Sequence, residues 1–324
     1  MIVDKEFFEG EEREGFYIEA KMKRFWAAEI EVLEEIKRIC QNNGIRYFAE
    51  WGTLLGAVRH NGFIPWDDDL DIGMLRDDWI RFMEIAPREL GPEFEVRNLY
   101  CDREHDQVIA RVINGRYMNF DEGHLARFHA CPFSAGIDVF PIDYLPRDVK
   151  KREEQDKLFR FLMKCASSLS AEPPYNEDDY EIVNRLQAMT GFQVNWDNRL
   201  YHELKKMVDE VCSYYQDEEA DTVCGFMRRY WQPTYEIPKQ WYQEVMEVPF
   251  EYTTIAIPIG YEGILRRKYG DDYMTPRNVG GGHSYPIYRE QELALKEVME
   301  QEFHVTMTLE DIQKIIDMKV FGEE

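Results

Sequence analysis

Positive charge is scarce in this sequence, which has 39 lysines and arginines against 63 aspartates and glutamates and a formal net charge of −24 at pH 7. Binding to the phosphate backbone of DNA or RNA requires a basic face, so we expect no nucleic-acid partner. The same acidity argues against a broadly basic surface for anionic membranes. An anionic substrate would have to be held by local cations or by metal ions.

Two further kinds of signal are missing. None of the six cysteines stands in a C-x-x-C spacing, which argues against a zinc ribbon or a thioredoxin-like site. No apolar run approaches the roughly 18 residues needed to cross a bilayer, and residues 1–6 lack the pattern of a secretory signal. We therefore expect no transmembrane segment and a cytoplasmic location, with a peripheral position at the inner membrane face as an option.

The composition is that of a folded chain, because 44% of the 324 residues are hydrophobic and 14% are aromatic. Helical and strand patterns alternate over residues 1–146 around a small mixed sheet flanked by helices. Beyond that point the pattern is mainly helical, with long helices predicted over 150–169 and 197–215 and a polar loop between them. We predict an α+β fold with a core at 1–146 and a mainly helical region at 147–324 that completes the substrate site. The two regions can share one hydrophobic core.

A run of aspartates marks the first region, within the segment WDDDLD at 66–71. A strand predicted over 69–74 places Asp69 and Asp71 on one face, because side chains alternate along a strand. Like charges on such a strand repel and lose hydration, whereas Mg²⁺ prefers carboxylate oxygens as ligands. A solvated acidic loop is the alternative interpretation. Asp67 and Asp68 are expected to shape the loop or to lie behind the ligands.

A third carboxylate is predicted on a later strand. Asp138 lies in the otherwise apolar segment at 136–140, which we expect to be a strand that ends before Pro141. It is our candidate for the third ligand, with a cap or a core hydrogen bond as the alternative role. Asp143 is expected to be a turn residue. The three carboxylates predict a site for Mg²⁺, with Mn²⁺ as a second option.

Gly52 and Thr53 lie between a strand predicted over 45–50 and a helix predicted over 54–59. Here we expect a turn with Thr53 as the helix N-cap. The exposed N–H groups at a helix start bind phosphate, and glycine allows a close approach. An ordinary helix cap is the alternative.

The motif resembles the signature of the LicD family. The segments GTLLGAVRH at 52–60 and GFIPWDDDLDI at 62–72 carry the resemblance, which extends over roughly 20–280. Trp51 stands where a small residue is expected, and the chain continues past the usual end of the family. The resemblance implies a nucleotidyltransferase fold of the DNA polymerase β type. It also implies transfer of a phospho-alcohol, phosphocholine being the best guess, from a CDP-activated donor to a hydroxyl of a cell-surface glycan or its lipid-linked precursor, with release of CMP.

Under this resemblance Asp69, Asp71 and Asp138 are the catalytic and metal-binding residues, and Asp138 is the candidate to accept the proton of the acceptor hydroxyl. The residues expected to bind substrate belong to the motif or carry positive charge: Gly52, Thr53, Arg59, Trp66, Arg111 and Lys268. The cations can equally form structural ion pairs. The segment at 280–283 (GGGH) is expected to be a flexible turn, with a mobile lid as the alternative.

Two other functions remain open. A nucleotidyltransferase that moves NMP from an NTP would use the same glycine, threonine and aspartates. A non-catalytic binding protein could retain the fold without the reaction. Neither the alcohol nor the acceptor follows from the residues.

Overall fold

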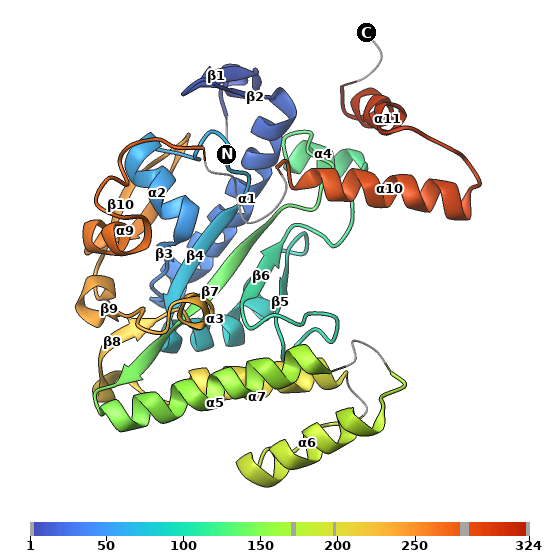
Figure 1. The fold of residues 1–324 in the computed structure, drawn as a ribbon. Helices are drawn as coiled ribbons and strands as arrows, with labels where there is room; N and C mark the ends of the chain where they lie inside the picture. The colour runs from blue at the N-terminus through green and yellow to red at the C-terminus, as the bar shows by residue number, and fades with distance from the viewer. Residues whose placement is uncertain (1–2, 170–172, 197–198, 279–284, 322–324) are drawn as a thin grey trace.

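A computed structural model describes residues 3–169, 173–196, 199–278 and 285–321, and it confirms the predicted α+β class (Figure 1). Its centre is a seven-stranded sheet in the order β3-β4-β7-β6-β5, with β8 and β9 continuing beside β7. The strands are β3 (Phe48–Ala49), β4 (Leu70–Leu75), β5 (Glu95–Arg97), β6 (Ala110–Ile113), β7 (Gly136–Pro146), β8 (Ala220–Cys224) and β9 (Ile237–Pro238). The sheet is mixed, because β4 and β7 are parallel whereas the other pairs are antiparallel.

Strand β7 is longer than expected. The prediction that it ends before Pro141 is wrong, and so is the prediction of a turn at Asp143, because the strand runs on to Pro146. Its pairing with β6 reaches only to Val139, and its pairing with β8 begins at Asp143. Pro141 therefore has only β4 beside it, where a missing amide hydrogen is tolerated.

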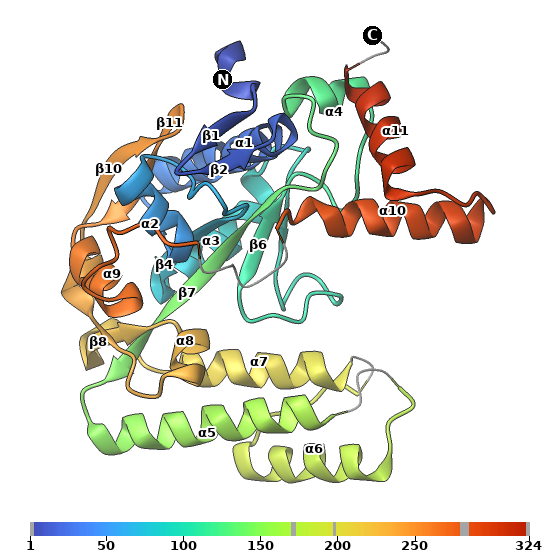
Figure 2. The ribbon, with the colours of Figure 1, turned by 45° about the horizontal axis from the view of Figure 1, so that its top comes forward.

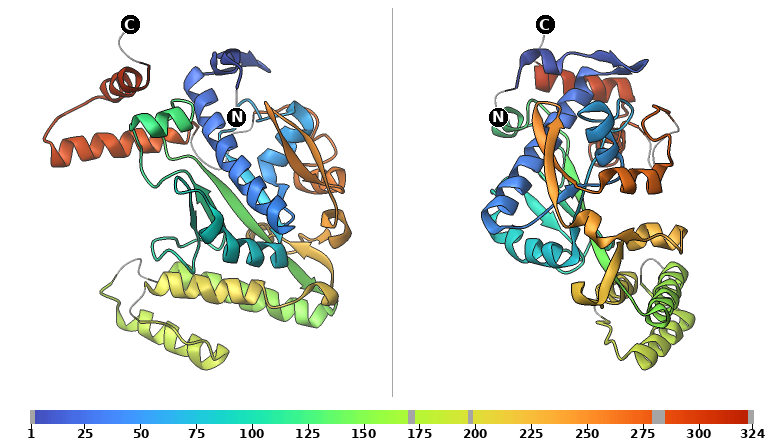
Figure 3. Two further views of the ribbon diagram at one scale, coloured as in Figure 1. Left: turned by 180° about the vertical axis from the view of Figure 1, so that it is seen from behind. Right: turned by 90° about the vertical axis from the view of Figure 1, so that its left-hand side faces the viewer.

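Two helices cover the face of the sheet opposite to the one seen in Figure 1, as the left view of Figure 3 shows. They are α1 (Ala20–Asn43) and α3 (Arg76–Glu89). Gly44 ends α1 with a φ of 60°, a left-handed conformation that suits glycine. Trp26 and Leu33 are fully buried on its apolar stripe. This helix therefore supplies the core beneath the strands.

The helices that directly follow β7, from α5 to α7, form a separate layer along one side of the molecule (Figure 2). The two predicted long helices are confirmed as α5 (Val149–Ser168) and α7 (Leu200–Cys212). The polar loop predicted between them is wrong in part, because it contains α6 (Glu177–Thr190). Asn176 and Asp179 form a capping box at its start, and Val183 and Leu186 are buried. A reciprocal cap and one short apolar stripe are enough to form this helix.

The other elements surround the sheet. They are β1 (Glu11–Arg13), β2 (Phe16–Ile18), α2 (Trp51–His60), α4 (Glu122–Arg127), α8 (Phe226–Trp231), β10 (Val245–Phe250), β11 (Thr253–Pro258), α9 (Tyr261–Tyr269), α10 (Tyr288–Glu302) and α11 (Leu309–Phe321). Short 3-10 turns lie at Lys5–Phe8, Asp217–Glu219 and Lys239–Tyr242. Among the described residues, no helix has both the length and the apolar character needed to cross a membrane.

The C-terminal α10 is anchored beside the start of α1. Lys21 forms an ion pair of 3.0 Å with Glu292, a residue that is 1% exposed. The side-chain amide of Gln291 donates to the carbonyl of Ser134 and accepts from its amide, both at 2.8 Å. The tail whose role the sequence left open is therefore part of the folded body.

Candidate active site

Asp71, Asp138 and Arg111 lie side by side on three adjacent strands of the sheet. Asp71 of β4 is in register with Asp138 of β7, which is in register with Arg111 of β6. The Arg111 Nε lies 3.3 Å from the Asp138 Oδ1. Gly136 leaves room for this guanidinium, since a Cβ there would approach Arg111 Nε to 3.0 Å. The fold thus brings two of the three predicted ligands together and sets a predicted cation beside them.

The start of α2 is hydrogen-bonded to Asp71, a member of this row of Asp71, Asp138 and Arg111. The amide of Asp71 donates to Thr53 Oγ1 at 2.8 Å, and the amide of Glu50 donates to the carbonyl of Asp71 at 2.9 Å. The prediction that Thr53 caps the helix is wrong. The helix begins at Trp51, and the Glu50 carboxylate accepts from the Trp51 amide at 3.4 Å. Gly52 and Thr53 therefore belong to the first helical turn, and Thr53 links that turn to β4.

The remaining aspartates of the run gather just before β4, which begins one residue after Asp69. Carboxylate oxygens of Asp67, Asp68 and Asp69 lie within 4.8 Å of one another. The Asp67 carboxylate faces Gly52 so closely that a Cβ at Gly52 would overlap it. Asp68 Oδ2 accepts from the amide of Ile287 at 2.6 Å, which ties the C-terminal segment to this turn. Asp68 therefore has a hydrogen-bond partner, Ile287, that agrees with its predicted loop-shaping role.

Negative charge dominates the electrostatics here. Burial raises the pKa of Asp71 well above its ordinary value, and the neighbouring Asp69, Asp138 and Asp67 raise it further. Carboxylates this close repel when they are all ionised. A hard divalent cation removes that repulsion, and it takes the oxygen ligands that this group offers. The residues present therefore fit Mg²⁺ or Mn²⁺.

Glu50 is a site residue that our sequence analysis missed. It is 1% exposed, and its carboxylate pairs with the buried ammonium of Lys268 and accepts from the Tyr242 hydroxyl at 2.8 Å. The Lys268 Nζ also lies 4.2 Å from the centre of the Trp51 ring. The predicted substrate-binding lysine is thus beside the row but paired with Glu50. No local pattern marks Glu50 for this role, because its two partners lie 192 and 218 residues away in the sequence.

Two other predicted residues contact segments outside the row of Asp71, Asp138 and Arg111. Arg59, in the last turn of α2, donates from Nη1 to the carbonyl of Tyr273 at 2.9 Å, and so it holds the loop after α9. Trp66 is partly buried, and its ring lies 6.3 Å from that of Phe16 in an edge-on contact. The segment at 280–283 lies outside the described residues.

Comparison with known proteins identifies the region that holds these residues. The family model described as "LicD/FKTN/FKRP, nucleotidyltransferase domain" matches residues 44–144. The chain is also 26% identical over 256 residues to the lipopolysaccharide cholinephosphotransferase LicD of Haemophilus influenzae, which covers 76% of this chain and 89% of that protein. Residues 44–144 thus match the LicD family, and most of the chain is similar to a LicD protein.

A shorter stretch of the chain resembles a vertebrate protein. Human ribitol 5-phosphate transferase FKRP is 35% identical to it over 69 residues, 21% of this chain but only 14% of FKRP. An uncharacterized protein of Rickettsia prowazekii is 47% identical over 58 residues, 18% of this chain and 22% of that protein. The family match at 44–144 contains Glu50, Thr53, Asp71, Arg111 and Asp138.

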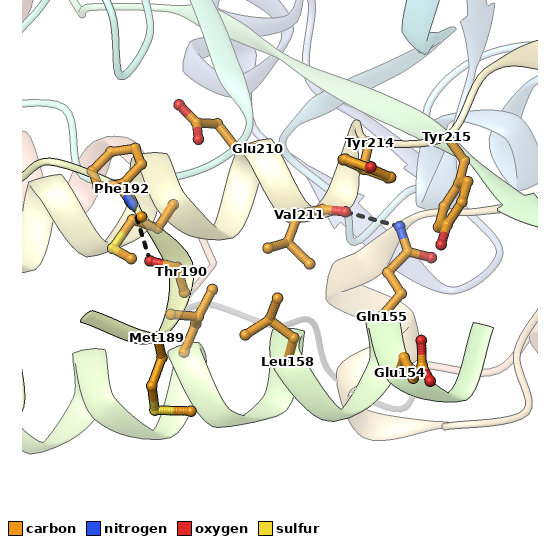
Figure 4. Close-up of a pocket in the computed structure, with 13 residues that line it drawn as sticks. Glu154, Gln155, Leu158, Met189, Thr190, Phe192, Glu210, Val211, Tyr214 and Tyr215 are labelled. Atoms are coloured by element: carbon orange, nitrogen blue, oxygen red, sulfur yellow. Dashed lines mark hydrogen bonds between the residues drawn. The ribbon is translucent and has the colours of Figure 1, made fainter. Parts of the chain in front are cut away.

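The helical layer has a cavity of its own, outside the region that matches the family model (Figure 4). Its walls come from α5, α6 and α7 and include Leu158, Met189 and Val211. The polar contact across it joins the Gln155 side chain to the Val211 carbonyl at 2.8 Å. This lining is mainly apolar, and its two carboxylates, Glu154 and Glu210, come from different helices. The edge formed by β4, β7 and α2 is therefore the candidate active site.

Proposed function

We propose that this chain transfers a phospho-alcohol, phosphocholine in the first instance, from a CDP-activated donor to a hydroxyl of a cell-surface glycan or its lipid-linked precursor, with release of CMP. The observation that carries the proposal is the row of Asp71, Asp138 and Arg111 beside the start of α2. The printed names of two relatives support it, since one is a cholinephosphotransferase and the other a ribitol 5-phosphate transferase. The match of residues 44–144 to the LicD family model makes a polymerase β-like nucleotidyltransferase core part of the same proposal.

Each residue of the row has a task in this reaction. The bond between the acceptor oxygen and the donor phosphorus forms, and the bond from that phosphorus to CMP breaks. Asp138 accepts the proton of the acceptor hydroxyl, and Arg111 beside it stabilises its charged form. The backbone amides of the first turn of α2, at Gly52, bind a phosphate of the donor. A divalent cation held by Asp69, Asp71 and Asp138 would supply positive charge against the diphosphate.

The test is a donor panel of CDP-choline, CDP-ethanolamine, CDP-glycerol and CDP-ribitol with Mg²⁺ and candidate glycan acceptors, read as CMP release. Asp71→Asn and Asp138→Asn should each lower the rate by about 10²-fold or more. Asp121→Asn is the matched control, because Asp121 is an exposed aspartate just before α4. CMP release at the wild-type rate in Asp71→Asn would contradict the assignment.

A second candidate is transfer of NMP from an NTP, since the matched family model is described as a nucleotidyltransferase domain. The same row and the same helix start would bind an NTP. Incubation of the chain with NTPs instead of CDP-alcohols separates the two functions. Pyrophosphate release without CMP release would favour the second.

A further inference from the structure

Arg228 of α8 is a cation near the start of α2 that our sequence analysis did not single out. Its guanidinium carbon lies 6.0 Å from the centre of the Trp51 ring and 5.8 Å from that of Tyr235. Its hydrogen bonds go to neutral oxygens. The Nε donates to the Gln232 side chain at 3.1 Å, and Nη2 donates to the carbonyl of Lys268 at 3.4 Å.

The charge of Arg228 has no carboxylate in an ion pair with it within the described parts of the chain. Its neighbours differ from it in this respect. The next residue, Arg229, donates from two nitrogens to Asp156 at 2.7 and 2.6 Å, and Lys268 pairs with the buried Glu50. Those two cations stabilise the fold, whereas the partly exposed Arg228 can pair with a negative charge on a ligand.

The Trp51 ring connects Arg228 to the candidate active site. Trp51 is the first residue of α2, directly before Gly52, and its ring lies 5.8 Å from that of Phe140. Phe140 follows Asp138 by two residues on β7, so both side chains lie on the same face of the sheet. The ring therefore contacts both Arg228 and the face that carries Asp138.

The hydroxyl of Tyr269, at the end of α9, gives the same placement. Burial raises its pKa above the ordinary value, and nearby acidic residues, Asp71 among them, raise it further. Arg228 opposes that rise. The guanidinium of α8 and a carboxylate of the active-site row therefore act on one hydroxyl.

Trp51 also indicates which part of a donor belongs here. Its φ of 46° is a left-handed conformation that is rare for a tryptophan, and such conformations concentrate at functional sites. Lys268 Nζ lies 4.2 Å from its ring centre, in addition to Arg228. Two cations near one ring make it a poor partner for the ammonium of choline. A nucleoside monophosphate fits better, because its phosphate is negative and its neutral base can stack on an aromatic ring.

We propose that Arg228 binds the phosphate of CMP beside the Trp51 ring, first within the CDP-activated donor and then in the released product; this assignment rests on the proposed function. The guanidinium N–H groups donate to phosphate oxygens. When the bond from the donor phosphorus to CMP breaks, its electron pair remains on the CMP oxygen, and Arg228 stabilises that negative charge. A residue outside the matched region 44–144 thereby contributes to the reaction.

The experiment measures binding of CMP to the full chain by isothermal titration calorimetry in a Mg²⁺ buffer, without acceptor. Arg228→Met and Arg228→Gln remove the charge, and each should weaken CMP binding by about tenfold or more. Arg228→Lys keeps the charge but lacks the planar fork, so it should restore part of the affinity. Arg185→Met is the matched control. This exposed arginine of α6 pairs with Glu181, and its variant should bind CMP as the wild type does.

Thermal unfolding separates a lost ligand contact from a lost fold. Without CMP, Arg228→Met should unfold close to the wild-type temperature, and the rise in Tm on addition of CMP should be smaller than in the wild type. Equal CMP affinity in the wild type and both neutral variants would overturn the assignment, and CMP release from the donor panel would still support the proposed function. A wild type that binds CMP through Arg228 but releases none from any CDP-alcohol would contradict the proposed function alone.

Discussion

Strand β7 carries two buried or partly buried aspartates, and their surroundings are opposite. Asp138 lies beside Asp71, a like charge, with a half-exposed arginine on its other side. Asp143, five residues further on, accepts a hydrogen bond of 2.6 Å from Arg76 Nε. The same guanidinium donates a hydrogen bond of 2.9 Å to Asp209. Tyr100 completes the second cluster with a 2.7 Å hydrogen bond to Asp209. At one end of the strand a buried arginine lies between two carboxylates, whereas at the other end two carboxylates lie side by side next to a partly exposed arginine.

The difference separates structural carboxylates from candidate functional ones. At Asp143 burial raises the pKa while Arg76 opposes the rise, so the chain itself provides the counter-charge. At Asp71 burial and the aspartates around it all raise the pKa. Carboxylates that bind a cation or a substrate are expected to lack a full counter-charge from the protein itself, and perturbed pKa values are common at such sites. The following experiments test whether this contrast is real.

The largest effect is expected from Arg76→Met. It leaves Asp143 and Asp209 buried together without a cation, which should destabilise the fold by about 3–5 kcal/mol. Urea unfolding at neutral pH measures this change. The double variant Arg76→Met/Asp143→Asn is the control and should recover part of the loss. A loss below about 1 kcal/mol in the single variant would mean that this cluster is no better paired than the active site.

The opposite sign is expected at the other end of the strand. In EDTA, Asp71→Asn should stabilise the protein by about 1 kcal/mol, because it removes a repelling charge and keeps the shape. Asp143→Asn should instead destabilise it by about 1–3 kcal/mol, since Arg76 loses a partner. Both variants are compared in the same urea titration. If both changes destabilised the protein equally, the distinction between the two clusters would be lost.

The sequence predicted much of this contrast but not its geometry. Alternation in β4 and the apolar frame of Asp138 predicted that both aspartates lie on strands. That Asp71 and Asp138 are neighbours depends on the order of strands 67 residues apart, which local patterns do not encode. Glu29 of α1 stands four residues after Phe25 and four before Leu33. The helical spacing therefore predicted that this carboxylate lies on the apolar stripe of α1, where the structure buries it. The partners of Lys268 and Asp143 come from distant segments and had no such signal.

The pH dependence of stability should also differ in sign between Asp71 and a carboxylate whose pKa is lowered. The folded-state pKa of Asp71 is raised above its ordinary value of 3.8, so the native state binds more protons than the unfolded state. In EDTA its contribution should therefore make stability fall as the pH rises above 3.8 and through the raised pKa. Mn²⁺ or Asp71→Asn should flatten this slope. A slope that persists in Asp71→Asn would assign it to another group.

Glu31 supplies the paired reference on α1. Burial alone would raise its pKa, but hydrogen bonds with His129 and Arg127 lower it from 4.5 to about 2. Its stabilising contribution is therefore complete above pH 4.5 and is lost as the pH falls toward 2, the reverse of Asp71. Glu31→Gln should remove this acid-side loss and cost on the order of 1 kcal/mol at neutral pH, a figure reduced for the solvent exposure of Arg127. Unfolding midpoints of the wild type and Glu31→Gln should converge at pH 2. If they remained as far apart there as at pH 7, the ion pair would not be the source of the difference.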